Sequence, residues 1–331
     1  MRGLEDAQHD AMFEIASIRG QAVIKNRLLA THSIDTSSIP LIALLFCCMF
    51  SPFAVRAEAL FRLGVINERP ERPSEAIAQY GPLNEYLRQK LNARGIRVGD
   101  LVIARDIDEI VQRIDAGDVD AFIEGVMPTL TVQKRTDKIS PRLLIWRKGQ
   151  RQYHTVFFVR RDSPIDSLQA LRGKTIVFES ERSTSAYFVP RAVLRAEGLH
   201  VAPAERLGST PAAVGYRFAG SELNQAYWVR AGRVEAGAFN DGDWERVPAS
   251  IRDDLRIIDR TRPILRWLFS VVTSLEPWVQ TAVLEVLTDM HRDPLGQAAL
   301  DAAERIAKLE DLTDEDRANL AYWSNALFAP D

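Results

Sequence analysis

The sequence predicts an α/β protein with two similar lobes, each an open, mostly parallel sheet flanked by helices, and a two-strand hinge between them. Three observations predict this class. The chain has 331 residues, of which 46% are hydrophobic and 26% charged, as in globular proteins with material for two domains. From Leu60 onward, strand and helix patterns alternate. Residues 106–121 are also echoed by residues 221–236, with a matching cap, helix length, glycine stop and following strand.

Residues 1–57 are predicted to be an N-terminal extension with a signal peptide for export. The apolar run 39–50 has the length of a secretory core and is too short to span a bilayer comfortably. Small or aliphatic residues fit cleavage after Ala57, and thus a periplasmic location; a membrane anchor and a buried helix are the alternatives. The only two cysteines, Cys47 and Cys48, lie in this run, which excludes a disulfide framework and a cysteine-based metal site from the rest of the chain.

The first lobe is predicted to begin with a strand at 61–66, followed by a helix that starts near Ser74. A strand at 101–104, a helix capped by Asp106 and a strand at 119–123 complete the start. Together these elements predict a parallel βαβαβ unit.

The second lobe is predicted to repeat this order. Strands are expected at 155–160, 174–179, 214–218 and 234–239, with helices at 187–197 and from the cap Ser221 to residue 231.

The end of the chain is predicted to return to the first lobe. Extended segments are expected at 255–258 and 265–272, and helices at 277–290, 294–309 and 314–328. We therefore expect crossings near 151–154 and 257–263. The predicted first lobe covers 58–152 plus 259–331, and the second covers 153–258.

Composition and motifs disfavour several functions. With 42 basic and 45 acidic side chains the formal charge is −3, so no nucleic-acid partner is expected. The sequence has no phosphate loop, nucleophile elbow, zinc-protease motif or dinucleotide-binding motif. Its three histidines after residue 57 are scattered. We therefore expect no enzyme, no cofactor and no metal.

The most informative segment joins a strand to a helix through Ser183, Thr184 and Ser185. Backbone N–H groups and the positive end of the helix dipole point out of such a turn. The three hydroxyls add donors, so the turn is suited to hold a tetrahedral oxyanion without a formal cation. Simple N-capping, for which one hydroxyl suffices, is the alternative.

Glu124 and Asn240 are candidates because strand ends face the same cleft, and Tyr80 is a third candidate from a predicted helix. Glu124 follows the strand 119–123, and Asn240 follows the strand 234–239. Tyr80 is placed to close over a ligand, although its helical spacing also fits plain core. For all three, a purely structural role is an equal alternative.

Several short motifs of the chain occur together in a known family. The most specific motif is Ser-Thr-Ser-Ala-Tyr at 183–187, which follows the predicted strand that begins with Gly-Lys at 173–174. Gln-Tyr-Gly-Pro-Leu at 79–83, Gly-Asp-Val-Asp at 117–120 and Leu-Arg-Gly-Lys at 171–174 support it. On these motifs the chain resembles the periplasmic phosphate/phosphite/phosphonate-binding proteins of ABC importers, which have a type II periplasmic-binding-protein fold.

The resemblance implies roles for the motif residues. Ser183, Thr184 and Ser185 would hold the oxygens of a phosphonate or phosphate. Tyr80 would line the pocket, and Tyr187, from the same motif as the hydroxyls, would lie with it.

One departure from the family affects the expected ligand. The family often has a histidine after a Gly-Ser pair at the start of a helix, but here Glu222 follows that pair. A carboxylate there repels a dianion unless it is protonated or paired with a ligand ammonium. A zwitterionic or less charged ligand is therefore an alternative, with Glu222, Asn240 and Glu124 at its polar or cationic end.

These observations predict an exported solute-binding protein that closes on a small-molecule ligand by hinge motion. The resemblance implies an ABC permease and ATPase as partners, and we expect a monomer. The alternatives are a periplasmic sensor partnered with a membrane kinase or cyclase, and an enzyme on the same scaffold.

Overall fold

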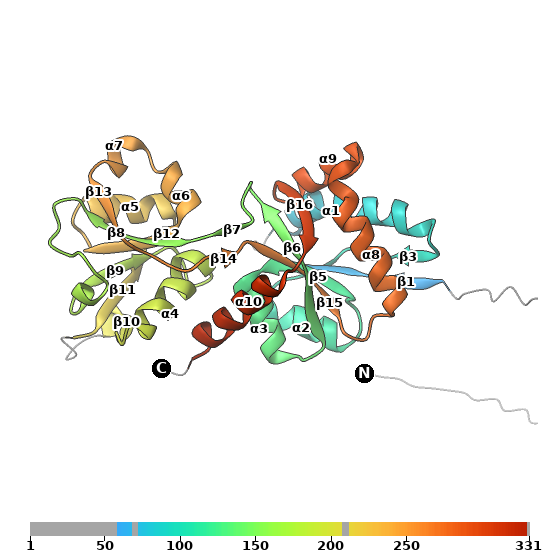
Figure 1. Ribbon diagram of the computed structural model, residues 1–331, viewed down its shortest axis with the longest axis horizontal. Helices are drawn as coiled ribbons and strands as arrows, with labels where there is room; N and C mark the ends of the chain where they lie inside the picture. The colour runs from blue at the N-terminus through green and yellow to red at the C-terminus, as the bar shows by residue number, and fades with distance from the viewer. Residues whose placement is uncertain (1–57, 68–71, 207–211, 330–331) are drawn as a thin grey trace, which may run out of the picture. The chain divides into compact units, whose positions relative to one another are not determined.

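The computed structural model describes residues 58–67, 72–206 and 212–329 (Figure 1). The predicted extension, signal peptide and cleavage site at 1–57 therefore lie outside the described residues. Among the helices of the described ranges, none is long and apolar enough to cross a membrane.

The first large sheet has six strands, with β4 (Val102–Ala104) at one edge and β16 (Ile306–Asp311), from near the end of the chain, at the other. Its order is β16, β6 (Ile139–Arg147), β15 (Trp267–Val272), β5 (Ala121–Gly125), β2 (Leu63–Ile66) and β4. Strand β2 pairs in parallel with β4 and β5, and the remaining three pairings are antiparallel.

Helices cover both faces of this sheet because successive strand residues point to opposite sides. On one face, Ile123 packs in a core with α1 (Pro73–Asn92), α8 (Pro277–Asp289) and α9 (Pro294–Ala302). On the other, Phe122 packs with α2 (Ile107–Asp115) and α3 (Val126–Arg135). A short parallel pair, β1 (Ala59–Phe61) and β3 (Ile96–Val98), lies beside α1.

The second large sheet also has six strands and two covered faces. Its order is β10 (Val201–Pro203), β11 (Val214–Phe218), β9 (Thr175–Phe178), β12 (Ala236–Asn240), β8 (Thr155–Arg160) and β13 (Leu255–Arg260). One face packs on α4 (Val189–Ala196), and the other on α5 (Glu222–Arg230), α6 (Asp241–Arg246) and α7 (Ala249–Arg252).

Two short strands carry the chain between the sheets. The chain runs from β6 through β7 (Gln152–Tyr153) into β8, and from β13 through β14 (Ile264–Leu265) back to β15, and β7 and β14 pair antiparallel. The last helix, α10 (Asp314–Leu327), lies on this connection and contacts α4. Its Asn319 Nδ2 and Trp323 Nε1 donate to the Pro263 carbonyl at 2.8 and 3.0 Å.

The predicted sequence repeat is confirmed at the level of elements. Helices α2 and α5 each have nine residues and follow side-chain caps, Asp106 and Ser221. Gly117 and Gly232 follow them with φ of 75° and 66°, a left-handed conformation that glycine adopts freely. Strands β5 and β12 then have five residues each, and each leads directly into a helix.

The predicted fold class is confirmed, with corrections of detail. The first sheet is mixed rather than mostly parallel. The strand predicted at 61–66 is two strands in different sheets. The helix predicted at 294–309 is wrong beyond Ala302, since the left-handed residues Glu304 and Arg305 (φ 63° and 55°) end it and β16 follows. The lobe boundaries stay a prediction, and β13 continues in the second sheet to Arg260.

Candidate functional site

Three helices begin at one edge of the second large sheet. Strands β9, β11 and β12 run parallel, so their carboxyl ends meet there. A π-helical turn, Thr184–Phe188, leads into α4, while α5 and α6 start nearby in the chain after β11 and β12. Each start has a side-chain cap: Ser183 Oγ accepts from the Ala186 N–H at 3.2 Å, Ser221 Oγ from the Asn224 N–H at 3.2 Å, and Asn240 Oδ1 from the Asp243 N–H at 3.0 Å.

The structure brings the hydroxyl turn and Asn240 together. Ser185 is buried, and its carbonyl accepts a hydrogen bond from the Thr155 hydroxyl at 2.8 Å, which ties the turn to β8. The Asn240 Nδ2 lies 3.5 Å from the Ser185 Oγ. Ser183 and Thr184 are partly exposed beside them. Four of the predicted site residues therefore form one cluster.

Glu222, the first residue of α5, sits among acidic neighbours. Burial, together with the nearby charges of Glu179 and Asp243, raises the pKa of its carboxyl from 4.5 to about 7. Arg246 acts in the opposite sense but does not outweigh them. The Glu222 carboxyl is therefore partly protonated near neutral pH, and in that form it can donate a hydrogen bond.

Tyr187 has the contacts of a core residue. Its hydroxyl lies 3.2 Å from the Tyr216 hydroxyl, and its ring packs against Phe178, Phe188 and Phe218 with centroids 5.1 to 5.4 Å away. These contacts account for its burial within the second sheet's core. They place its side chain in a structural role for the π-helical turn.

Tyr80, in a helix that packs on the first large sheet, and Glu124, in a strand of that sheet, do not join the cluster around Ser185. Tyr80 is buried in α1 and lines a cavity of about 150 Å³ at the end of β2, together with Asn67, Gln79 and Glu304. Glu124 lies within β5 rather than after it, and its carboxylate accepts the Gly125 N–H at 2.9 Å.

The acidic pair around Glu222 was not predicted. Glu179 follows the end of β9, and Asp243 lies in the first turn of α6. The available signal was the same one that identified Asn240, namely that side chains at the carboxyl ends of parallel strands share one edge.

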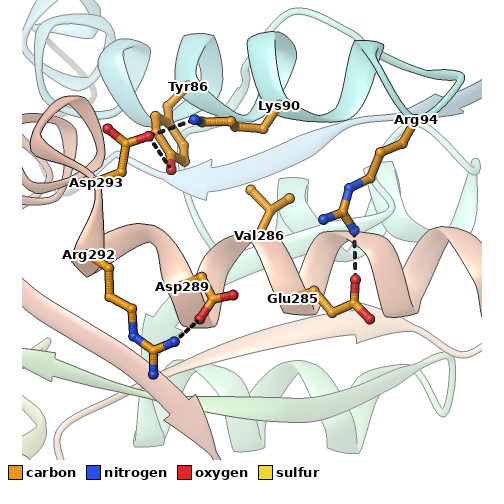
Figure 2. A pocket seen from close by; sticks show the side chains of 8 residues that line it. All are labelled: Tyr86, Lys90, Arg94, Glu285, Val286, Asp289, Arg292 and Asp293. Atoms are coloured by element: carbon orange, nitrogen blue, oxygen red, sulfur yellow. Dashed lines mark hydrogen bonds and ion pairs between the residues drawn. The ribbon is translucent and has the colours of Figure 1, made fainter.

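A larger cavity, of about 270 Å³, lies between α1 and α8 (Figure 2). Its charged side chains pair with one another: Lys90 Nζ lies 2.6 Å from Asp293, Arg94 lies 2.7 Å from Glu285, and Arg292 lies 2.7 Å from Asp289. Burial and the Asp293 carboxylate raise the pKa of Tyr86 to about 12. The cations of this cavity already have carboxylate partners. The cavity is therefore a weaker candidate for an anion-binding site than the cluster around Ser185. In the described part of the chain, no group of three or more potential ligand side chains is arranged to hold a metal ion.

The chain is similar to solved structures and to a family model. Two structures of XAC2383 from Xanthomonas citri, one bound to chloride ion and one to ATP, share 31% and 30% identity with it, at TM-scores of 0.70 and 0.71. Both comparisons cover 81% of this chain and 97% of the other. PhnD1 from Prochlorococcus marinus, in complex with methylphosphonate, shares the fold at 16% identity and a TM-score of 0.54, over 82% of this chain and 98% of that one.

The family model is described as "ABC transporter, phosphonate, periplasmic substrate-binding protein" and matches residues 70–317, which include every strand of both large sheets except β2. A match over this length, together with a relative at 31% identity, shows the family. The chain belongs to the periplasmic phosphonate substrate-binding proteins of ABC transporters.

Proposed function

We propose that the chain captures a small ligand with a tetrahedral oxyanion, such as a phosphonate or phosphate group, and delivers it to an ABC permease and its ATPase. The observation that carries this proposal is the hydroxyl-rich turn at the carboxyl edge of the second sheet. There Ser183 caps a helix start, Ser185 contacts Asn240, and Thr184 lies between them partly exposed.

The turn provides neutral donors for an anion. The N–H groups of Thr184 and Ser185 lie in the first helical turn, where N–H groups have no acceptor within the helix. The positive end of the helix dipole adds to their attraction for negative charge. The turn is held in place from behind by the hydrogen bond between Thr155 and the Ser185 carbonyl, so little ordering is needed on binding.

The carboxylates beside the turn restrict the ligand. Glu179, Glu222 and Asp243 disfavour a second negative charge on the same group, unless Glu222 is protonated. A ligand ammonium would instead be attracted to them. We therefore favour an aminoalkylphosphonate, or another oxyanion with a nearby cationic group, over inorganic phosphate.

The relatives bind anions, which supports the class of ligand. XAC2383 has been solved with ATP and with chloride, and PhnD1 with methylphosphonate. Tyr80 and Glu124, in the first lobe, would meet the ligand when the two lobes close. Export after cleavage at Ala57 belongs to the same proposal, because the ligand would be captured in the periplasm.

A thermal-shift experiment tests the proposal. Purified, ligand-free protein is heated with methylphosphonate, aminoethylphosphonate, phosphate or methanesulfonate. A ligand at 100 times its dissociation constant should add about 2.7 kcal/mol to the free energy of unfolding. Aminoethylphosphonate should give the largest shift, and Ser183→Ala with Ser185→Ala should abolish it.

A matched control separates binding from loss of a helix cap. Thr313 caps α10 through its hydroxyl, so Thr313→Ala removes a comparable cap of about 1 kcal/mol away from the turn. That variant should keep the full ligand shift. If no oxyanion shifts the wild-type protein, or if the serine variants respond like Thr313→Ala, the assignment of the turn is wrong.

A further inference from the structure

Arg266 lies on the second crossing segment, between β14 and β15, and its guanidinium forms no ion pair with a carboxylate in the described part of the chain. Its N–H donates to the Arg151 carbonyl at 2.9 Å, which fixes it beside the other crossing. The guanidinium lies 5.1 Å from the centre of the Tyr153 ring. The side chain is mostly buried, and its Nε is fully buried with no acceptor among the residues that the structure describes.

The surroundings of Arg266 carry more positive than negative charge. The charges that act on it are those of Arg147 from β6 and of Asp243 and Arg246 from α6. Lys148 also interacts electrostatically with Arg266. Two carboxylates are already engaged by other cations: Glu304 accepts from Arg147 at 3.1 Å and lies 3.8 Å from Lys148, and Asp243 pairs with Arg246. The next carboxylate, Asp241, pairs with Arg260 at 3.0 Å. Four cations therefore share Glu304 and Asp243.

This excess charge is unfavourable in the unliganded protein. Burial lowers the pKa of Arg266, and the charges of Arg147 and Arg246 act in the same direction. A guanidinium nevertheless stays protonated, so the cost of burying it is not relieved by losing the proton. Buried charges in proteins are normally paired, and an unpaired one indicates a missing partner.

Arg266 is also connected to the hydroxyl turn. Asp243, a carboxylate that interacts electrostatically with Arg266, accepts from the Asn240 side chain, and the Asn240 Nδ2 lies 3.5 Å from the Ser185 Oγ. The Asn240–Asp243 pair thus contacts the turn on one hand and interacts with the charge of Arg266 on the other. This shared pair links the guanidinium to the site proposed for the oxyanion.

We propose that Arg266 binds a second anionic group of the ligand, separate from the oxyanion held at Ser183–Ser185. This inference rests on the proposed function, which it deepens by adding to the ligand class: besides the cationic group that the carboxylates beside the turn attract, the ligand has a second acidic group a few bonds from the oxyanion, as in a phosphonate-bearing amino acid. The guanidinium binds a carboxylate or phosphate with two parallel hydrogen bonds, which a lysine cannot reproduce.

Calorimetric titration of the full chain with three compounds tests this. Phosphonoacetate and pyrophosphate have two acidic groups, and methylphosphonate has one. The wild type should bind the first two at least about tenfold more tightly than methylphosphonate. Arg266→Gln should weaken phosphonoacetate on the order of 10- to 100-fold and methylphosphonate less than about twofold, and Arg266→Lys should recover part of the loss.

Arg262→Gln is the matched control, because Arg262 lies on the same segment and also stacks on a tyrosine ring, Tyr322, at 4.3 Å, but is exposed. It should bind every compound as the wild type does. The unliganded Arg266→Gln protein should melt no lower than the wild type, which shows that it folds.

The outcomes separate this inference from the proposed function. The role of Arg266 is overturned if Arg266→Gln binds all three compounds like the wild type, or if the wild type shows no preference for two acidic groups. If the serine variants lose all binding while Arg266→Gln behaves as wild type, the oxyanion site at the turn is supported and the anion-binding role of Arg266 is refuted. If only Arg266→Gln loses binding of phosphonoacetate, the anion-binding role of Arg266 is supported and the oxyanion site at the turn is refuted.

Discussion

Replacing Glu222 by glutamine is expected to stabilise the protein above neutral pH and to remove part of the pH dependence of its unfolding. The reason is the acidic neighbourhood at the start of α5. Burial, followed by the charges of Glu179 and Asp243, raises the pKa of Glu222 from 4.5 to about 7. A carboxyl whose pKa is higher in the folded than in the unfolded state binds more protons when folded, so its contribution to stability falls as the pH rises.

The structure sets the pH window and the size of the effect. Below pH 4.5 the group is protonated in both states and costs nothing. Between about 4.5 and 7 the unfolded chain ionises first, and folding free energy is lost until both states are ionised above 7. The full loss would be about 3 kcal/mol. Because Glu222 is partly exposed, solvent screening reduces it, and we expect about 1–2 kcal/mol.

Urea unfolding at pH 5.0, 6.0, 7.0 and 8.0 would measure this difference, with two-state behaviour checked by two spectroscopic signals. The advantage of Glu222→Gln over the wild type should grow across this series and level off near its upper end. Glu315→Gln is the control, since Glu315 also lies in the first turn of a helix but is exposed. An advantage that is the same at every pH, or that grows equally for Glu315→Gln, would refute the reasoning.

Two further predictions concern buried groups away from the ligand. Asp316 is buried, which opposes its ionisation, but hydrogen bonds from Arg151 and Thr313 hold its pKa below the usual range. Asp316→Asn should therefore lower the free energy of unfolding by about 3 kcal/mol at pH 7, measured in urea. The difference between wild type and variant should vanish as the pH falls below the usual aspartate range, through the lowered pKa. A cost that is independent of pH would contradict this. Tyr187→Phe should cost about 1 kcal/mol by removing the contact with the Tyr216 hydroxyl, and it should change ligand affinity less than twofold; a tenfold loss of affinity would show that Tyr187 binds the ligand.

Local signals in the sequence identified many elements well. The strands expected at 155–160 and 214–218 have those bounds in the structure. The caps Asp106 and Ser221 were also predicted, and each accepts a backbone N–H three residues later. These features depend on short-range chemistry, namely alternating apolar residues and side-chain caps, which a sequence displays directly.

Features that depend on distant segments were missed. Residues 303–311 have helical spacing, but β16 forms there because it pairs with β6, more than 150 positions earlier. Strand β6 itself was not predicted. At the site, Ser185 and Asn240 could be placed together from the rule on strand ends, whereas Arg266 gains its surroundings from β6, α6 and the two crossings, which no local pattern brings together.

The repeat of α2–β5 as α5–β12 allows the helix starts of the two sheets to be compared at one equivalent position. The helix after β5 begins at the cap Gly125, and the helix after β12 begins at the equivalent position, Asn240. A Cβ at Gly125 would lie in van der Waals contact with the Trp267 ring, 3.4 Å from its indole nitrogen, and glycine leaves this position without a side chain. Asn240 instead carries an amide that reaches the Ser185 hydroxyl. The two copies therefore share a helix start at the same position, but only the second copy has a side chain there that contacts the hydroxyl turn.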